Sequence, residues 1–431
     1  MTAQTASLAV NGGPKSVTLP VPAWPVVGER EVRRMEEVVR SGKWSWLGPH
    51  ETAFCREYAA FCGTRYCIGL ANGTVTMQCA LQAVGVVPGD EVIVPGLTWV
   101  ATAQAALDIG ADVVLVDIDP ETLCIDPKSA AAAITPRTKA IVPVHLYGCM
   151  CDMDAILALA RTHGLKVVED AAHQHGGIWR GKRAGALGDA GSFSFQQSKV
   201  LTSGEGGAVI TSDPEVYRAV FALKQVGWGP TPEAAAGDDW AAPALEPANR
   251  YGHNYRITEM QCALLRGGLS RLEEQTRVRD ENAQYLAERL RRIGGPLRGA
   301  RRDPRIERQA YYALTLYYDA AQAGGLPRKG YAGALCAEGV GVWTTYCPVY
   351  RAPLLNLYDR TSPVPFRDPA RLQDYKGLRL PNVEKAAEQT ALVLPHTHLL
   401  GSRDYLDQLV AGIAKVNDNL AEARACFEKG N

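Results

Sequence analysis

Short apolar runs alternate with helix-like stretches between residues 69 and 210, and this alternation is the clearest pattern in the chain. Most positions in each run are apolar, so both faces of the segment are apolar, which is typical of strands covered on both sides. Strands of this kind, separated by helices, form a mainly parallel sheet. The sequence therefore predicts an α/β fold with a mainly parallel central sheet. The runs lie at residues 91–95, 113–117, 140–144, 166–169 and 208–211.

The flanking segments predict the rest of the architecture. Residues 29–40 have an amphipathic helical pattern that Gly42 ends, and residues 257–290 have a longer, highly charged one. Residues 310–318 alternate like a strand, whereas residues 229–249 lack periodicity, which predicts a long loop acting as a lid or an intersubunit arm. The predicted parts are an N-terminal arm, a large domain and a smaller α+β C-terminal domain, at residues 1–27, 28–271 and 272–431.

Composition and charge narrow the class of protein. The chain has 431 residues, of which 46% are hydrophobic and 21% charged, so it is globular and long enough for about two or three domains. Its 46 basic residues balance 46 acidic ones, which gives no indication of a nucleic acid or an anionic membrane as partner. A small neutral or locally charged substrate fits this balance better.

Targeting signals, disulfides and metal sites are not expected. The N-terminus carries no basic stretch followed by an apolar run, and nowhere do about 18 apolar residues follow one another, so we expect a cytoplasmic protein. The 11 cysteines are an odd number scattered among core-like segments, which favours reduced thiols. Cys149 and Cys151 are too close for the usual zinc pair, and no third ligand accompanies His396 and His398.

Polar side chains follow several of the predicted strands. Thr98 and Trp99 come after the first run, Asp117 ends the second, and His145 and Asp170 follow the next two. Ligands of parallel sheets gather at the carboxyl ends of the strands, so the chemistry is expected along this edge. For His145, a packed structural histidine is an equally good interpretation.

Lys199 is the strongest single candidate for catalysis. It follows the apolar Phe193 and Phe195 and is followed by the glycine-rich residues 203–207. This setting predicts a buried amine, which can form a Schiff base with a carbonyl group. Taken alone, a lysine between glycine turns is more often a solvated surface residue.

Two other patterns point to binding of a flat, phosphorylated molecule. Gly73, Thr74 and Val75 precede a helix-like run, and free N–H groups at a helix start can bind phosphate, although most such starts only cap the helix. Trp99, after the first strand, can stack on a flat ring, although a core or interface tryptophan is commoner.

Asp170 and His173 form a third pattern, an acidic residue at a strand end with a histidine three positions later. A buried aspartate can hold a pyridinium nitrogen protonated, although a helix cap is an equal alternative. Together with Lys199, the patterns predict pyridoxal 5'-phosphate. Thr74, the Val75 amide and Ser194 would bind the phosphate and are called the phosphate cup, and Trp99 would stack on the ring. Asp170 would pair with the ring nitrogen, and Lys199 would form the Schiff base.

At these residues the chain resembles the DegT/StrS family of sugar and cyclitol aminotransferases, from about residue 24 to beyond residue 255 and more loosely afterwards. The resemblance implies the fold-type I architecture of aspartate aminotransferase. It also implies that Gly73–Thr74 and Ser194 bind the cofactor's phosphate and that Trp99 stacks on its ring. It further implies that Asp170 pairs with the ring nitrogen, that His173 lies near the ring hydroxyl and that Lys199 bears the cofactor. Dehydratases of the family have a histidine in place of the lysine, so Lys199 favours transamination.

The resemblance further implies a homodimer with shared active sites. The family's Asn-Tyr-Arg segment matches residues 254–256, in which Asn254 would reach the phosphate of the neighbouring subunit's cofactor. Residues 94–102, 143–148 and 196–197 resemble the branch that aminates scyllo-inosose or its 2-deoxy form with L-glutamine in aminoglycoside pathways. Residues 346–351 resemble the family's substrate-facing Tyr-Pro segment more loosely.

Several alternatives remain open at the level of sequence. The acceptor can instead be a nucleotide-linked keto sugar, and 3-amino-5-hydroxybenzoate synthases form a nearby branch. A noncatalytic protein with this fold would be expected to have lost Lys199, Asp170 or the phosphate cup, and none is lost. A dinucleotide-binding enzyme is disfavoured because no Gly-x-Gly-x-x-Gly turn follows the early strands. The expected mechanism is ping-pong transamination, in which Lys199 moves protons and Asp170 keeps the ring nitrogen protonated.

Overall fold

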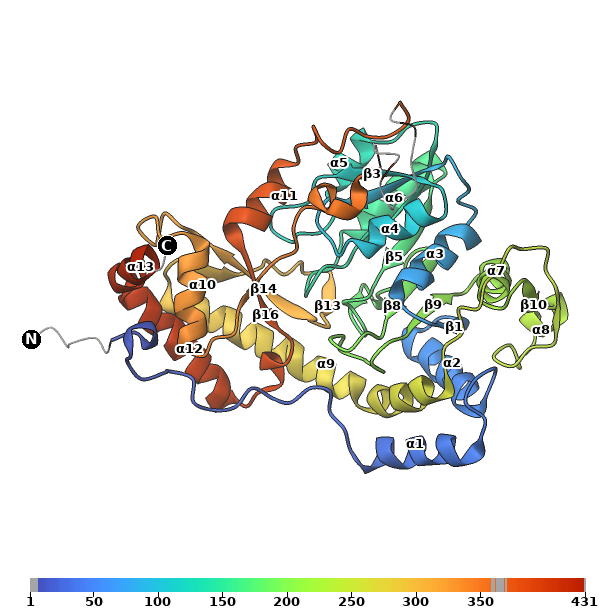
Figure 1. Cartoon of the computed structure of the whole chain (residues 1–431), viewed down its shortest axis with the longest axis horizontal. Helices are drawn as coiled ribbons and strands as arrows, with labels where there is room; N and C mark the ends of the chain where they lie inside the picture. The colour runs from blue at the N-terminus through green and yellow to red at the C-terminus, as the bar shows by residue number, and fades with distance from the viewer. Residues whose placement is uncertain (1–6, 358–360, 362–367, 369, 430–431) are drawn as a thin grey trace, which may run out of the picture.

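A seven-stranded sheet forms the centre of the larger half of the molecule (Figure 1). The structure is a computed structural model that describes residues 7–357, 361, 368 and 370–429. The five central and edge strands from β8 to β3 run parallel, whereas β9 pairs antiparallel with both β8 and β1. The predicted mainly parallel sheet is confirmed. In spatial order its strands are β1 (Tyr66–Leu70), β9 (Gly207–Thr211), β8 (Ala190–Ser194), β5 (Lys166–Asp170), β4 (Thr138–Ile141), β2 (Glu91–Pro95) and β3 (Asp112–Val116).

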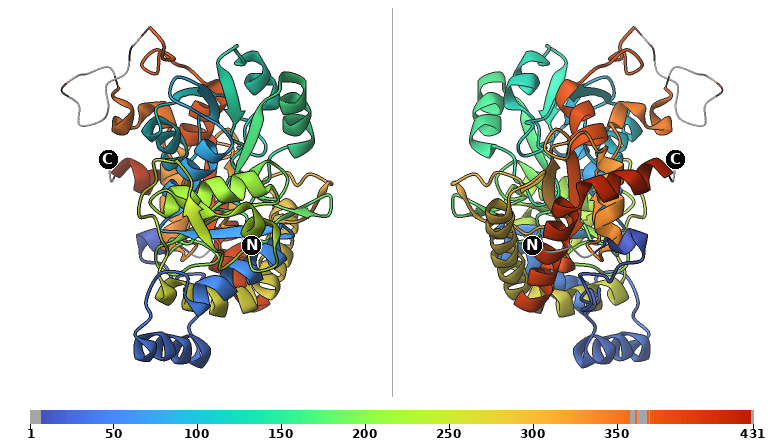
Figure 2. Two further views of the ribbon diagram at one scale, coloured as in Figure 1. Left: turned by 90° about the vertical axis from the view of Figure 1, so that its right-hand side faces the viewer. Right: turned by 90° about the vertical axis from the view of Figure 1, so that its left-hand side faces the viewer.

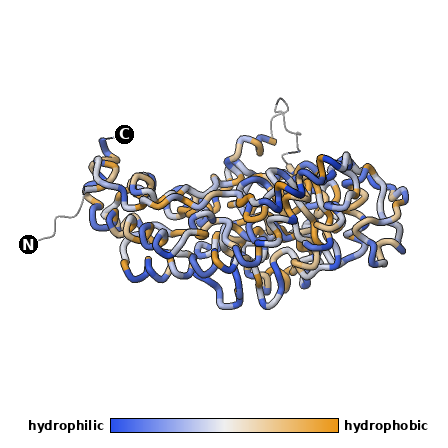
Figure 3. The backbone as a smooth tube through the Cα atoms, turned by 90° about the horizontal axis from the view of Figure 1, so that it is seen from below, coloured by the Kyte–Doolittle hydropathy of each residue, from blue (hydrophilic) through white to orange (hydrophobic). Residues whose placement is uncertain are grey.

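Helices cover this sheet and bury its strands. Every residue of β1, β2 and β9 is buried, which explains their continuous apolar sequences. The helices of this half are α1 (Glu29–Ser41), α2 (Pro49–Cys62), α3 (Gly73–Ala83), α4 (Ala101–Asp108), α5 (Pro127–Ala132), α6 (Met153–His163) and α7 (Pro214–Lys224). Figure 3 shows hydrophobic segments gathered inside this half and hydrophilic segments along its outer edges.

A smaller antiparallel sheet forms the second half. Its strands, in spatial order, are β12 (Leu297–Gly299), β14 (Ala313–Tyr318), β16 (Ala391–Pro395) and β15 (Trp343–Thr344). The predicted smaller α+β C-terminal part is confirmed. Its helices and short turns are α10 (Arg328–Ala337), η2 (Val349–Arg351), η3 (Pro353–Leu355), α11 (Pro381–Lys385), the π-helical η4 (Ala386–Thr390), η5 (His398–Leu400), α12 (Arg403–Asp418) and α13 (Leu420–Lys429).

One continuous helix, α9 (Glu259–Ile293), joins the two halves along one side of the molecule (Figure 1). It begins with a capping box in which Thr258 and Gln261 satisfy each other's backbone N–H groups. The predicted domain boundary at residue 272 falls inside this helix, and the division at residues 28–271 and 272–431 stays a prediction. Residues 358–360, 362–367, 369 and 430–431 of the predicted small domain lie outside the described residues.

The N-terminal arm packs on the C-terminal half rather than on the sheet that follows it in sequence. Its turn η1 (Ala9–Asn11) lies next to α10 and α13. Leu8 is fully buried in the second hydrophobic core, and the Ala9 N–H donates to Glu338 at 2.7 Å. Residues 1–6 of the predicted arm lie outside the described residues.

The predicted long loop at residues 229–249 contains short helical and strand elements, and its role as a lid or an intersubunit arm stays a prediction. This segment contains α8 (Pro232–Ala236), and its ends form the strand pair β10 (Trp228–Pro230) and β11 (Leu245–Pro247). The Trp240 carbonyl accepts a hydrogen bond from the buried Tyr217 hydroxyl, which ties the segment to α7. A further three-stranded sheet joins β6 (Ile178–Trp179), β7 (Lys182–Arg183) and β13 (Ile306–Arg308). Elements this short lack the repeats on which pattern reading depends.

A buried ion pair fixes α7 against α2. The Lys224 ammonium donates to Glu51 at 2.6 Å and to the Gly69 carbonyl at 3.1 Å, and both charged side chains are at most 3% exposed. Burial alone would lower the pKa of Lys224, but the charge of Glu51, its hydrogen bond and the nearby Cys55 and Cys262 together raise that pKa above its usual value.

Replacing Glu51 with Gln is therefore expected to destabilise the protein by about 3–5 kcal/mol, because the Lys224 charge stays buried without its counter-ion. Urea unfolding of the wild type and the variant measures this loss. The double variant Glu51→Met/Lys224→Met is the control and should recover much of the stability. A loss below about 1 kcal/mol in Glu51→Gln would show that the pair is not desolvated.

Candidate active site

The carboxyl ends of four strands bring the predicted site residues to one cavity of about 400 Å³. Gly73 follows β1, Trp99 follows β2, Asp170 ends β5 and Ser194 ends β8. The predicted residues that line the cavity are Gly73, Thr74, Trp99, Asp170, His173, Ser194 and Lys199. The sheet edge predicted from the strand pattern therefore carries the site.

Lys199 lies in the connection between β8 and β9, and its position follows from that turn. The Phe195 N–H donates to the Gly206 carbonyl and the Gln197 N–H to the Gly204 carbonyl, so the hairpin continues beyond the strands. Gly204 and Gly206 have φ of +85° and +144°, which glycine adopts without strain. The turn directs the lysine inward, and Lys199 is only 9% exposed.

The amine of Lys199 is desolvated rather than paired. Within the described residues it makes no hydrogen bond or ion pair, and its Nζ lies 4.4 Å from the centre of the Tyr312 ring. Burial lowers the pKa of Lys199 from 10.5 to about 8, and the charge of the nearby Asp170 opposes this shift. At pH 7 roughly a tenth of the amine is thus uncharged and nucleophilic, far more than for an ordinary lysine.

Asp170 is oriented by two hydrogen bonds. The Thr102 hydroxyl donates to its Oδ2 at 2.7 Å, and the Ala172 N–H donates to its Oδ1 at 3.2 Å. Thr102 is nearly fully buried on α4. The carboxylate is therefore held as an acceptor at the cavity wall.

His173 is held in one tautomer. The Tyr147 N–H donates to its Nδ1 at 3.1 Å, so the neutral ring carries its proton on Nε2. Burial, and then the charge of Lys199, keep the pKa of His173 well below its usual value. The side chain is thus a neutral hydrogen-bond donor at the cavity.

The start of α3 fits an anionic group. A Cβ added to Gly73 would lie 2.6 Å from the Ser194 Cβ, so only glycine lets the helix start come this close to the serine. Asn72 caps the helix and accepts from the Val75 N–H at 3.0 Å. Thr74 and Ser194 line the cavity, whereas Val75 does not, and its amide is already bonded to the cap.

Asn254 lies outside this cavity on an exposed segment. Its backbone pairs with Gln225, and its Oδ1 accepts from the Arg256 N–H. The structure therefore does not bring Asn254 to the site of its own chain.

Some cavity residues were not identified from the sequence. Tyr312 contributes from the second half of the molecule, and its ring stacks on His173 with centroids 4.0 Å apart. Ser198 and Gln196 form a short network, in which the Ser198 Oγ lies 2.7 Å from Gln196 Oε1 and 3.0 Å from the Tyr312 hydroxyl. Tyr346, which the sequence analysis assigned to a substrate-facing segment, also lines the cavity.

Three further histidines, His145, His396 and His398, have structural surroundings. His145 is fully buried, accepts from the Cys151 N–H and lies 2.9 Å from Glu169. His396 and His398 are buried, and His396 Nε2 lies 3.1 Å from the Ser198 carbonyl. Across the described residues, no group of three or more His, Cys, Asp or Glu side chains could hold a metal ion.

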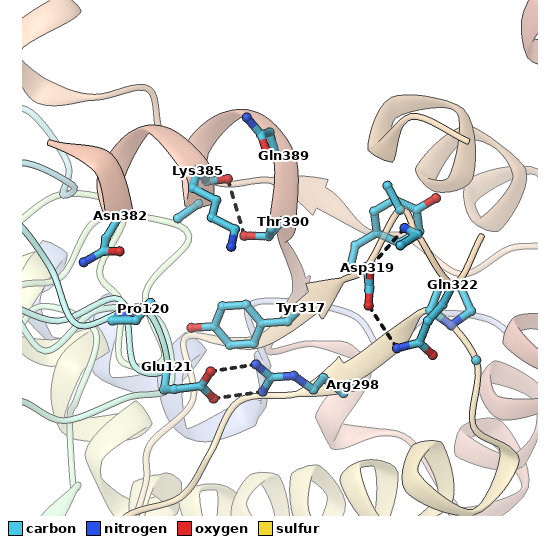
Figure 4. Close-up of a pocket in the computed structure, with 16 residues that line it drawn as sticks. Pro120, Glu121, Arg298, Tyr317, Asp319, Gln322, Asn382, Lys385, Gln389 and Thr390 are labelled. Carbon is cyan, nitrogen blue, oxygen red and sulfur yellow. Dashed lines mark hydrogen bonds and ion pairs between the residues drawn. The ribbon is translucent and has the colours of Figure 1, made fainter. Parts of the chain in front are cut away.

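A second cavity, of about 570 Å³, lies between residues 120–121 and the C-terminal sheet (Figure 4). There Arg298 donates to both carboxylate oxygens of Glu121, at 2.8 and 3.0 Å. These side chains are 55% and 38% exposed, so the pair joins the two halves with little gain in stability. The described residues that line this cavity include none of the predicted site residues.

No helix in the described part of the chain combines the length and the apolar character that crossing a membrane requires.

Because the Lys199 amine is buried, we expect the free energy of unfolding to depend on pH. The pKa of Lys199 is about 8 in the folded protein and 10.5 in an ordinary lysine, so the unfolded chain binds more protons between these pH values. The wild type should therefore lose stability relative to Lys199→Met as the pH falls from about 10.5 to about 8, by about 1.4 kcal/mol for each pKa unit. Hydroxylamine treatment first releases Lys199 from any bound cofactor. Urea unfolding across this pH range then measures the difference in the free energy of unfolding between the two proteins. Parallel curves for the two proteins would contradict a desolvated amine.

Comparisons with known proteins agree with this geometry. The profile of the DegT/DnrJ/EryC1/StrS aminotransferase family matches residues 25–412. The chain is 40% identical over 423 residues to the L-glutamine:2-deoxy-scyllo-inosose aminotransferase of Streptomyces lividus, covering 95% of this chain and 97% of the relative. It is 38% identical over 427 residues to the L-glutamine:scyllo-inosose aminotransferase of Streptomyces griseus, covering 96% and 99%.

Among solved structures, the crystal structure of 3-amino-5-hydroxybenzoic acid synthase matches with a TM-score of 0.80 at 33% identity, covering 92% of this chain and 98% of that one. The fold-type I architecture and the family resemblance predicted from the sequence are confirmed. The chain belongs to the DegT/DnrJ/EryC1/StrS family and is a pyridoxal phosphate-dependent aminotransferase of sugars or cyclitols.

Proposed function

We propose that this enzyme transfers the amino group of L-glutamine to the ring ketone of a cyclitol such as scyllo-inosose or 2-deoxy-scyllo-inosose, in the biosynthesis of an aminocyclitol. One observation of the site carries the choice of acceptor. Of the described residues that line the cavity, Lys199 is the only Lys or Arg. An acceptor carrying a diphosphate needs cationic partners, whereas a neutral polyhydroxylated ring needs hydrogen-bond partners. The relatives from Streptomyces lividus and Streptomyces griseus support the same choice.

The residues at the cavity fit pyridoxal phosphate. The close approach of Gly73 and Ser194 leaves a helix start and a hydroxyl side by side, which suits a phosphate group. Asp170 is an oriented carboxylate that suits a protonated ring nitrogen, and Trp99, at 57% exposed, is free to stack on the ring. When bound, the cofactor supplies a carbonyl that carries the amino group and a ring that delocalises an electron pair.

We assign the proton transfers to Lys199. With the cofactor bound, its desolvated amine would be placed to take a proton from the α-carbon of the amino donor and to return it to the carbon that was the cofactor's carbonyl carbon. With a pKa of about 8, the amine is present both as base and as acid near neutral pH. His173 contributes its Nε2–H as a neutral donor, which suits a ring hydroxyl. Thr102 keeps Asp170 in place, and Trp99, Tyr312 and Tyr346 add aromatic surface to the cavity wall.

We also propose a homodimer in which Asn254 serves the neighbouring site. Asn254 lies on an exposed segment outside the cavity of its own chain. Helix α1 projects from the body of the molecule (Figures 1 and 2), and Val32 and Val39 on it are 53% and 55% exposed. Trp44, just after this helix, is 51% exposed. Apolar side chains gathered on a projecting element support burial against a second copy of the chain.

Replacing Lys199 with Ala is expected to abolish transamination, because no other described amine lines the cavity. The measurement is turnover with L-glutamine as donor, together with mass spectrometry of peptides after borohydride reduction. In the wild type, reduction should fix the cofactor to the peptide that contains Lys199, and the variant should carry no label. Lys182→Ala, on the exposed end of a short surface strand, is the control. Full activity of Lys199→Ala would contradict the mechanism.

A comparison of ketones tests the acceptor. The described residues of one chain that line the cavity offer a diphosphate no cation besides Lys199. We therefore expect kcat/KM for scyllo-inosose or its 2-deoxy form to exceed that for a nucleotide-linked keto sugar by about tenfold or more. Product analysis by mass spectrometry identifies the aminated ketone. Preference for the nucleotide-linked ketone would support the alternative that the enzyme is a nucleotide-sugar aminotransferase. Turnover of neither ketone would favour the 3-amino-5-hydroxybenzoate synthase alternative, to which the matched crystal structure points.

A further inference from the structure

Tyr147 connects the two halves of the molecule behind the active site without lining the cavity itself. It follows β4, is only 3% exposed and has φ of +56°. A non-glycine residue in this left-handed region is strained and persists only where its surroundings hold it. The contacts of Tyr147 must therefore hold its backbone in this conformation.

Four polar contacts of Tyr147 reach residues around the cavity. Its N–H donates to His173 Nδ1 at 3.1 Å, and its carbonyl accepts from the Tyr312 N–H at 3.0 Å. Its hydroxyl accepts from the Tyr346 N–H at 3.1 Å and lies 2.9 Å from the Thr345 Oγ1. Three of these four partners, His173, Tyr312 and Tyr346, line the cavity.

The hydroxyl of Tyr147 contacts residues 345 and 346, and the Tyr346 side chain forms one wall of the cavity, called the Tyr346 wall below. This residue follows the short strand β15, whose Trp343 is 61% exposed, and precedes the exposed Cys347. The Tyr346 ring stacks on the Tyr147 ring at 5.4 Å and lies 5.6 Å from the Trp99 ring. The pairing of β15 with β16 and the hydrogen bond from the Val349 N–H to the Gly96 carbonyl hold the two ends of this segment, and the Tyr147 hydroxyl holds the Tyr346 N–H between them.

We propose that Tyr147 is a positioning residue that sets the Tyr346 wall and thereby the selectivity for a ring ketone, an inference that rests on the proposed cyclitol acceptor. A cyclitol is a rigid six-membered ring, so it cannot adapt to a displaced wall. L-glutamine is a flexible chain and can adapt by rotating its bonds. Loss of the wall should therefore weaken binding of the acceptor much more than binding of the donor.

Tyr147→Phe tests this inference because it removes only the hydroxyl and keeps the ring and both backbone contacts. We expect KM for the cyclitol ketone to rise about tenfold, as for the loss of one or two buried hydrogen bonds, and the single-turnover rate with L-glutamine to stay within about twofold. Tyr331→Phe is the matched control. Tyr331 is fully buried and donates to Asn417 at 2.7 Å in the second core, so its variant loses a hydroxyl of the same kind away from the site.

A second readout needs no ketone. In the wild type the Tyr346 N–H is bonded to the Tyr147 hydroxyl, so hydrogen exchange in the peptide around Tyr346 should be about tenfold faster in Tyr147→Phe and unchanged in Tyr331→Phe. Thr345→Val, which removes the other partner of the hydroxyl, should shift KM in the same direction by a smaller factor. If Tyr147→Phe fails to fold, KM of Thr345→Val for the ketone tests the inference in its place.

Unchanged exchange at Tyr346, an unchanged KM for the ketone, or equal losses for donor and acceptor would overturn the inference. A wild type that aminates another ketone but no cyclitol would contradict the proposed function alone. In that case KM is compared for the ketone that is used, and the exchange measurement is unaffected. The two proposals can thus fail separately.

Discussion

The site depends on keeping a lysine amine out of water without giving it a counter-ion in hydrogen-bonding contact. In the β8–β9 hairpin, Glu205 near the tip is exposed, but the Lys199 side chain turns inward and is only 9% exposed. Gly204 and Gly206 let that turn fold back at positive φ. Desolvation then shifts the amine toward its neutral form, and the more distant Asp170 limits the shift.

The same sheet edge explains why residues far apart in sequence act together. Each parallel strand delivers its next residue to one edge, so Gly73, Trp99 and Asp170 meet although almost 100 residues separate the first from the last. The helices that follow add their own contributions. Thr102 on α4 orients Asp170, and the start of α3 lies against Ser194. Gly73, Thr102 and Asp170 thus lie on regular elements, whereas Lys199 is held in the connection between β8 and β9.

Sequence patterns predicted the parallel sheet and the site residues at its edge well, because buried parallel strands and the residues at their ends leave local signals. The runs at residues 91–95 and 166–169 correspond to β2 and β5 almost residue for residue. By contrast, β8 reads Ala-Gly-Ser-Phe-Ser, and its small and polar residues give no strand pattern although the strand is central. The Val75 amide was expected at the phosphate cup, yet Asn72 occupies it, since an asparagine before a helix competes for the same N–H.

Contacts between the halves could not be read from the sequence, because they depend on how the two halves dock. Tyr312 comes from the C-terminal half, and no local pattern says that it faces Lys199 and His173. Tyr346, from the same half, was expected near the substrate only through the family resemblance. Helix α9 runs unbroken through both halves, which limits how far one can turn against the other. The residues to which we assign proton transfer therefore belong to the larger half, whereas Tyr346, which we propose as a wall for the acceptor, belongs to the smaller one. Selectivity in this architecture can change through the C-terminal half without disturbing the residues that move protons.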